Sequence, residues 1–255
     1  AAGNTLHVTK THRWFDESRP ALFETLTYIT ANHVKDRVGW ARLPSEGMRD
    51  ILGATVGSGG LGQLAVRRGA TTLGFKNIAL YWLAVFREDP PAYELDLTPF
   101  TDTPIKHIFL ATEDDARLAL AIAASKLGFA WWYCTGDDFN VTAETVKSIP
   151  VNVAALSADA RARLRDLGDA LVADFPNHVL FTKYAGKWMG NFVLSEMRDI
   201  TDRIDAILAD ELGYTDLLPA LEHAYYCAYK PTGDRPGTLR YDPAKARLAE
   251  SRIVD

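Results

Sequence analysis

The sequence contains few of the residues and patterns on which several protein classes depend. Its 255 residues include only two cysteines, Cys134 and Cys227, without metal-ligand spacing or the density of a disulfide-rich secreted domain. No apolar run reaches the roughly 18 residues that a membrane-spanning helix needs, and the N-terminus shows no signal-peptide pattern. These absences together favour a cytoplasmic protein.

The residues of common hydrolytic sites are also missing. The six histidines form no H-x-x-x-H or H-E-x-x-H pair, and no G-x-S-x-G nucleophile motif occurs, so neither a zinc site nor a nucleophile elbow is predicted. The net charge of −5 argues against indiscriminate nucleic-acid binding. However, residues 1–87 hold 11 lysines and arginines against 6 acidic residues. This basic part is either a phosphate-facing surface or ordinary variation in composition.

What the chain does contain is enough apolar surface for a large core. Hydrophobic residues make up 47% of the sequence and aromatic residues 11%, which excludes a disordered protein. The patterns predict a mixed α/β (α+β) fold, with a strand-containing domain over 1–155 and a mainly helical region with a loop-rich tail over 156–255. The expected elements are a helix over 20–31, strands over 71–75, 78–86, 93–97 and within 100–110, and helices over 157–175, 195–212 and 216–229. Ser157 and Ser195 are expected to cap the first two of these last helices, and Gly213 is expected to end the second.

Residues 111–150 combine a capped helix, three large rings and a polar loop. Thr112 precedes three acidic residues, as at a helix N-terminus, and apolar residues then recur at helical spacing. Trp131, Trp132 and Tyr133 follow and lead into a loop of short polar side chains. Either the rings and the loop form a recognition surface, or the rings close a core and the loop is a solvated turn.

This stretch resembles a segment that follows the catalytic domain in bacterial adenine-N6 DNA methyltransferases of type II, especially type IIG-like, restriction–modification and related phage-defence systems. In that family an apolar helix leads into a W-W/Y-Y run, a short polar loop with aspartate and a V-x-x-[IF]-P turn. The stretches WFDESRPALFETLTY and IDAILADELGYTD are similar to two further segments of the same proteins, in the same order. The three matches cover most of the chain.

The resemblance implies a target-recognition region detached from its catalytic domain. Its expected partners are duplex DNA and the N-terminal methyltransferase domain of the parent protein. The whole enzymes of this family use S-adenosylmethionine and flip adenine out of the duplex, with the cofactor pocket and an NPPY-type motif in that N-terminal domain. The chain alone is therefore expected to bind DNA without turnover, with no cofactor or metal. The stretch from Asp89 to Ala92, D-P-P-A, lacks the motif's final aromatic ring and is rejected as catalytic.

Candidate DNA contacts fall into two groups. Those proposed for base or groove contact are Thr135, Asp137, Asp138, Asn140 and Lys147. Those proposed for phosphate are Arg67, Arg68 and Lys76 near the glycine-rich stretch, and Lys183 and Lys187 around Tyr184. The two aspartates either accept from a cytosine amino group or simply order their loop. For each basic residue the alternative is a solvated surface charge.

Two other functions remain open at this stage. Residues 57–62, GSGGLG, satisfy the G-x-G-x-x-G pattern of a dinucleotide-binding oxidoreductase and follow the strand-like ILGATV. Against this, only six residues separate Gly62 from the next glycine, and the next acidic residue is Glu88, so neither the crossover helix nor the ribose ligand is in place. The third alternative is a scaffold in which the apolar faces of the helices over 157–175 and 195–212 pack a partner subunit.

Overall fold

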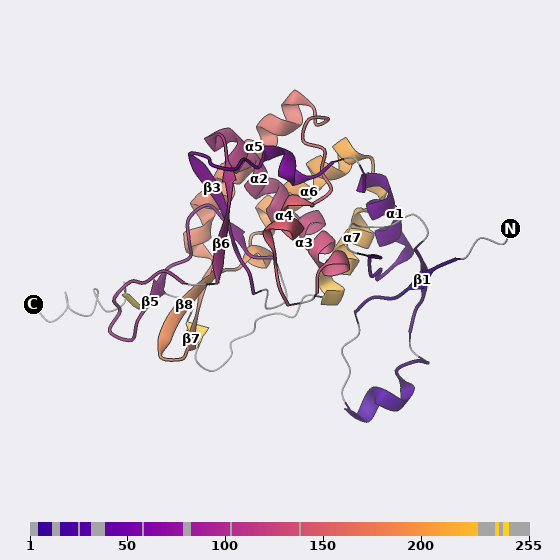
Figure 1. The fold of residues 1–255 in the computed structure, drawn as a ribbon, viewed down its shortest axis with the longest axis horizontal. Helices are drawn as coiled ribbons and strands as arrows, with labels where there is room; N and C mark the ends of the chain where they lie inside the picture. The colour runs from indigo at the N-terminus through magenta and orange to yellow at the C-terminus, as the bar shows by residue number, and fades with distance from the viewer. Residues whose placement is uncertain are drawn as a thin grey trace, which may run out of the picture.

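The computed structural model shows a mixed α/β fold with three antiparallel sheets (Figure 1). It describes residues 5–11, 16–24, 26–31, 39–57, 59–78, 83–102, 104–137, 139–228, 238–239 and 242–244. The predicted fold class is therefore confirmed. None of the helices in these ranges is long and apolar enough to cross a membrane.

Seven α-helices and five short 3-10 helices lie in the described part of the chain. The α-helices are α1 (Glu46–Thr55), α2 (Glu113–Ala124), α3 (Lys126–Thr135), α4 (Ala143–Lys147), α5 (Ala158–Asp174), α6 (Arg198–Leu212) and α7 (Leu218–Ala228). The 3-10 helices are η1 (Asp16–Ala21), η2 (Leu61–Leu64), η3 (Phe175–Asn177), η4 (Leu194–Glu196) and η5 (Thr215–Leu217).

The strands are short, and the three sheets join distant parts of the chain. The strands are β1 (His7–Val8), β2 (Ile29–Thr30), β3 (Thr71–Lys76), β4 (Val85–Phe86), β5 (Ala92–Tyr93), β6 (Ile105–Leu110), β7 (Val179–Tyr184), β8 (Lys187–Phe192) and β9 (Thr238–Leu239). Their orders are β1-β2, β4-β3-β6 and β5-β8-β7-β9. The longest pairings are β3 with β6 and the β7–β8 hairpin.

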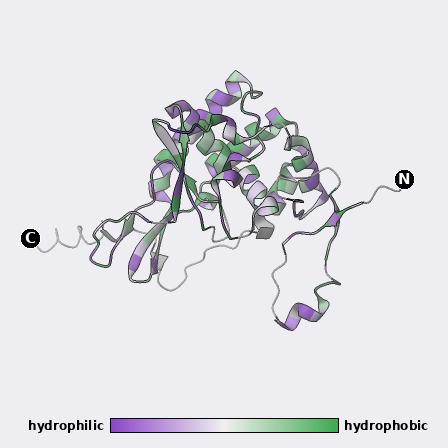
Figure 2. Ribbon diagram, viewed as in Figure 1, coloured by the Kyte–Doolittle hydropathy of each residue, from purple (hydrophilic) through white to green (hydrophobic). Residues whose placement is uncertain are grey.

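The helices α2 and α3 form the centre of the molecule. Thr112 caps α2 by accepting from the backbone N–H of Asp115 at 3.1 Å, and Ser125 separates the two helices and caps α3. Residues 118–134 are buried without interruption, as expected for a helix pair that is apolar on all sides. Hydrophobic stretches dominate these central helices in Figure 2. The predicted cap at Thr112 is confirmed.

The predicted boundary at residue 155 does not separate two cores. One hydrophobic cluster includes buried residues from both sides of it, α5 packs along α2, and β5 pairs with β8. The part expected to be mainly helical also contains the β7–β8 hairpin. Two of the predicted helix ends in this part are confirmed: Ser157 caps α5, and Gly213 ends α6 in the left-handed conformation with φ of 76°.

Several predicted elements are wrong. The helix over 20–31 is absent, because η1 ends at Ala21 and Ile29 is buried in β2, paired with β1. The ILGATV stretch is not a strand, since its first five residues end helix α1, whose N-cap is Ser45. Ser195 does not cap α6, which begins after Met197. Short apolar runs are ambiguous between strand and helix, so the tertiary contacts decide them.

Candidate functional site

The three rings after α2 are part of the core. Trp131, Trp132 and Tyr133 lie on α3 and are at most 7% exposed, so the interpretation in which they close a core is the right one. The indole N–H groups of the two tryptophans nevertheless form hydrogen bonds with groups nearer the surface. The indole N–H of Trp131 donates to Ser148 Oγ, and that of Trp132 donates to the backbone oxygen of Asn140, both at 3.0 Å. The two indole rings therefore anchor the loop between α3 and α4, and the end of α4, to the core.

An open cleft of about 840 Å³ lies beside α4. It is lined by residues of the glycine-rich stretch, the end of α3 and α4, namely Val56, Gly57, Gly59, Gly60, Gly62, Gln63, Trp131, Thr135, Thr142, Glu144, Thr145, Lys147, Ser148 and Pro150. The volume is within the usual range of ligand sites. Two of the predicted contact residues, Thr135 and Lys147, thus meet the glycine-rich stretch in one place. We call this region the α4 cleft.

The glycines of the cleft are explained by close packing against α4 at two positions and by backbone conformation at the other two. A Cβ atom on Gly60 would lie 2.7 Å from the backbone oxygen of Lys147, and one on Gly62 would lie 3.1 Å from the Cβ of Lys147. Gly57 and Gly59 have φ of +92° and +111°, which favours glycine. The stretch joins helix α1 to the 3-10 helix η2, whereas a dinucleotide fold needs a strand before and a helix after. The glycine pattern therefore serves packing and turn geometry.

Hydroxyl groups line the cleft and are engaged in internal hydrogen bonds. Thr135 Oγ1 donates to the backbone oxygen of Trp131 at 2.7 Å, and Ser148 Oγ donates to that of Thr145 at 3.0 Å. The hydroxyls of Thr142 and Thr145 lie 2.9 Å apart. These bonds fix the local structure of the cleft wall. The titratable side chains of the lining are Glu144 and Lys147.

The loop between α3 and α4 is ordered by its own side chains. The Asp137 carboxylate accepts from the backbone N–H groups of Phe139 and Asn140 at 3.0 and 2.5 Å, and from Asn140 Nδ2 at 2.6 Å. Burial raises the pKa of Asp137, but these bonds outweigh it and lower the pKa overall. The loop-ordering interpretation of Asp137 therefore agrees with the geometry. Asp138 lies outside the described residues.

One predicted phosphate contact, Lys76, is wrong. Its side chain is buried at the end of β3, where Nζ donates to the backbone oxygen of Gly190 at 2.9 Å and to Asn191 Oδ1 at 2.7 Å. Asp102 lies 3.3 Å away. Burial lowers the pKa of Lys76, and the Asp102 carboxylate partly offsets this. Arg67 and Arg68, by contrast, are exposed between η2 and β3, as a phosphate contact requires.

The remaining predicted cations lie on the β7–β8 hairpin. Lys183 and Tyr184 are exposed at its tip, Tyr184 by 71%, and Lys183 Nζ lies 5.5 Å from the centroid of the Trp188 ring. Lys187 forms an ion pair of 2.8 Å with Glu94. In Figure 1 this tip points away from α4, at the lower left of the view. The structure therefore places Thr135 and Lys147 at the α4 cleft, and Lys183, Tyr184 and Lys187 at the hairpin tip.

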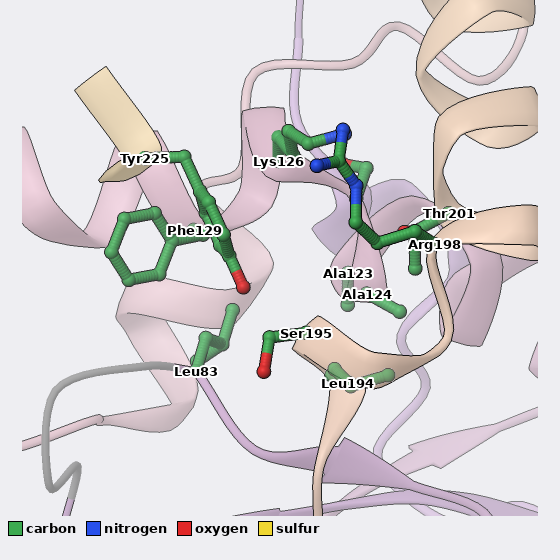
Figure 3. A pocket seen from close by; sticks show the side chains of 11 residues that line it. Leu83, Ala123, Ala124, Lys126, Phe129, Leu194, Ser195, Arg198, Thr201 and Tyr225 are labelled. Carbon is green, nitrogen blue, oxygen red and sulfur yellow. The ribbon is translucent and has the colours of Figure 1, made fainter. Parts of the chain in front are cut away.

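A second cavity, between α2, α3, α6 and α7, is too small for an organic ligand. Its volume is about 20 Å³, room for about one water molecule. Figure 3 shows Phe129 and Tyr225 on one side and Lys126 and Arg198 on another. Lys126 Nζ bonds Asp202 and Asp205, the latter at 2.9 Å. The cavity thus adjoins a buried ionic network that joins α3 to α6.

Comparison with known proteins assigns neither a family nor a function to the chain. We found no matching family model, no similar curated protein and no similar solved structure. Among the described residues there is also no group of three or more histidine, cysteine or acidic side chains that suits a metal ion. The sequence-based prediction missed Thr142, Glu144 and Thr145 as cleft residues. The pair Thr142 and Thr145 carries a helix N-cap pattern that could have placed α4 in advance.

Proposed function

We propose that this chain is the duplex-DNA recognition module of an adenine-N6 DNA methyltransferase. It would position the target adenine for a catalytic domain of the parent protein that binds S-adenosylmethionine. The observation that carries the proposal is the α4 cleft, where the end of the ring-containing helix and the V-x-x-I-P turn, both within the stretch that resembles this family, meet the glycine-rich stretch. The proposal therefore rests on the resemblance and on this convergence together.

The chemistry of the two surfaces suits DNA. Recognition of a duplex needs cations and small donors that hold phosphates, and side chains that reach base edges. The cleft supplies the Lys147 ammonium group, hydroxyl oxygens and exposed glycine backbone. The hairpin supplies Lys183, Lys187 and the exposed Tyr184 ring at the tip of the two central strands of the β5-β8-β7-β9 sheet. Arg67 and Arg68 add two exposed charges close to the cleft in sequence.

The alternatives lose their structural basis. The scaffold hypothesis needs exposed apolar faces on the helices over 157–175 and 195–212. The stripe residues of these helices, such as Leu164, Leu171, Ile204 and Leu208, are instead buried, because α5 packs on α2 and α6 within the chain itself. The oxidoreductase hypothesis needs a strand before the glycines, where the chain forms helix α1.

Salt dependence is the direct test of the proposal. If five candidate cations all contact phosphates, the slope of log K against log salt should be about −4.5. These cations are Arg67, Arg68, Lys147, Lys183 and Lys187. Affinity for a random-sequence duplex should then fall by roughly 500-fold between about 50 and 200 mM salt. Fluorescence anisotropy with a labelled duplex measures this. A chain that binds no duplex even at the lower salt concentration would disprove the proposal.

We expect the Lys147→Met variant to bind every duplex more weakly. Methionine keeps the side-chain stem that packs on Gly62 and removes the charge. Loss of one phosphate contact should lower the salt-dependence slope by about one and weaken all sequences to the same degree. The matched control is Arg203→Met, which removes one charge from an exposed position on α6, outside the cleft. Equal slopes for both variants would remove Lys147 from the interface.

A further inference from the structure

We infer that the ring of Tyr184 binds DNA by stacking on the face of one nucleobase, at a point where the duplex is locally opened. This inference rests on the proposed function and gives the hairpin tip a contact that differs from phosphate binding. Tyr184 is 71% exposed at the end of β7, directly before the turn into β8. The hairpin tip projects from the helical part of the molecule in Figure 1, so a large ligand has access to it.

The backbone at the tip is fixed by a tight turn and a continuous strand pairing. β7 and β8 pair over their full lengths, and Tyr184 pairs with Lys187 in the last position. The two turn residues between them, Ala185 and Gly186, have φ of 49° and 80°, the left-handed conformation of a two-residue hairpin turn. The backbone of Tyr184 is therefore held in place before any ligand binds, which lowers the entropy cost of a stacking contact.

Two lysines flank this ring, and other side chains of the tip hold them. Lys187 Nζ lies 2.8 Å from Glu94 Oε1 and 4.4 Å from the centroid of the Phe100 ring. Lys183 Nζ lies 5.5 Å from the centroid of the Trp188 ring and forms no ion pair with any described residue. The tip therefore offers one ammonium group without a carboxylate partner, on the residue that precedes the exposed ring.

The ring of Tyr184 is mostly free of contacts with the described part of the chain. Within those ranges it stacks on no other ring, and its hydroxyl group forms no hydrogen bond. Other rings of the same sheet are packed, as are Tyr93 and Phe181, whose centroids lie 6.0 Å apart. Strands favour aromatic residues because the rings pack on neighbouring side chains, but the cross-strand neighbour, Lys187, is held by other partners. The strand position alone therefore does not account for the ring.

The chemistry of the tip fits a nucleobase beside a phosphate group. An aromatic ring stacks on the π-face of any base, so the contact tolerates different sequences. The ammonium group of Lys183 can hold a phosphate of the same strand. In a closed duplex the neighbouring base pairs cover both faces of every internal base, so a face becomes accessible only where a base is unpaired or a base step is opened. The tip should therefore prefer a duplex that contains such a point.

The test compares two duplexes of the same sequence, one fully paired and one with an abasic site that leaves the opposite base without a partner. We expect the unaltered chain to bind the second duplex about tenfold more tightly, within the range of roughly five- to hundredfold that one base–aromatic stack contributes. Tyr184→Ala should remove this preference and leave the salt dependence unchanged, because no charge is lost. Tyr184→Phe should retain the preference, because it keeps the ring.

A fluorescent base shows whether the ring itself makes the contact. With 2-aminopurine opposite the abasic site, binding of the unaltered chain should quench the emission of the base through stacking, and the Tyr184→Ala variant should not. The matched control is Tyr28→Ala, which removes another tyrosine ring, 55% exposed, from a position beside β2. This variant should retain both the preference and the quenching. Urea unfolding of the three variants checks that each is folded.

The outcomes distinguish this inference from the proposed function. Salt-sensitive binding without a preference for the abasic duplex overturns the stacking role and leaves the DNA-recognition function standing. A preference that survives Tyr184→Ala, or that Tyr184→Phe also loses, shows that the face of the ring does not make the contact. Failure of the unaltered chain to bind either duplex at low salt overturns both. A preference and a quenching that Tyr184→Ala removes and Tyr184→Phe retains support the inference.

Discussion

The Lys126→Ala variant is expected to lose about 3–5 kcal/mol of its free energy of unfolding at pH 7.5, the usual effect of breaking a buried ion pair. Asp205 is 2% exposed, and its carboxylate accepts from Lys126 Nζ and from the backbone N–H of Lys126, both at 2.9 Å. Removing the ammonium group leaves this carboxylate buried with the backbone bond alone. Asp202 and Arg198 lie at the network's outer edge and do not replace the lost charge.

The difference in free energy of unfolding between the Lys126→Ala variant and the unaltered chain should grow as the pH rises above about 6. Burial raises the pKa of Asp205 to about 6 from 3.8, although Lys126 acts in the opposite direction. A raised folded-state pKa stabilises the protein fully below the unfolded pKa, and this contribution is lost as pH rises to the folded pKa. Without Lys126 the pKa of Asp205 rises further. Above about pH 6 the free energy of unfolding of the variant therefore continues to fall with pH, whereas Asp205 no longer lowers that of the unaltered chain. The pKa of Lys126 is raised and that of Asp202 lowered, so neither titrates in this range.

Urea unfolding at pH 5 and pH 7.5 measures both the loss and its pH dependence. The control is Arg163→Ala, which breaks an exposed ion pair with Asp159 on α5 and should change the free energy of unfolding by no more than about 0.5 kcal/mol. A Lys126→Ala variant that matches this control at both pH values would show that the network adds nothing to stability. A deficit larger at pH 5 than at pH 7.5 would contradict the assignment to Asp205.

Local signals in the sequence predicted the features that local interactions determine. Thr112 and Ser157 were identified as N-caps, and each accepts the expected backbone hydrogen bond in its helix. The buried stripe of α5 and the glycine stop after α6 followed from periodicity and from left-handed backbone geometry. Such features depend on residues within a few positions of one another, so a single sequence contains the necessary information.

The features that the sequence did not predict depend on distant partners. Trp131 and Trp132 follow a capped helix in either interpretation, and only the covering by α4 and α7 makes them core. The sequence predicts Lys76 as a surface charge. In the fold, β8 provides two hydrogen-bond partners for it, the backbone oxygen of Gly190 and the Asn191 side chain. The glycine-rich stretch satisfies a cofactor motif by its spacing, yet Gly60 and Gly62 are required by close packing against α4, far along the chain. Long-range packing overrode each local pattern.

The same long-range packing predicts opposite signs for two Gly→Ala substitutions inside helices. Gly168 lies on α5 where it crosses α2, and a Cβ atom there would lie 2.3 Å from the backbone oxygen of Arg117. Alanine is intrinsically better in a helix by about 1 kcal/mol, but the two helix backbones would have to separate, and overpacking typically costs about 1–3 kcal/mol. We therefore expect Gly168→Ala to lower the free energy of unfolding by up to about 2 kcal/mol net, since a contact with backbone cannot relax by a rotamer change.

Gly53 on α1 is the matched control, because a Cβ atom there meets nothing within 4 Å. Only the helix propensity and the reduced entropy of the unfolded chain act at this site, so Gly53→Ala should raise the free energy of unfolding by about 0.5–1 kcal/mol. Thermal and urea unfolding of both variants measure the two signs. Stabilisation by both substitutions would show that α5 and α2 are less closely packed than described. Destabilisation by both would instead show that the space beside Gly53 is occupied by a neighbouring group of the chain.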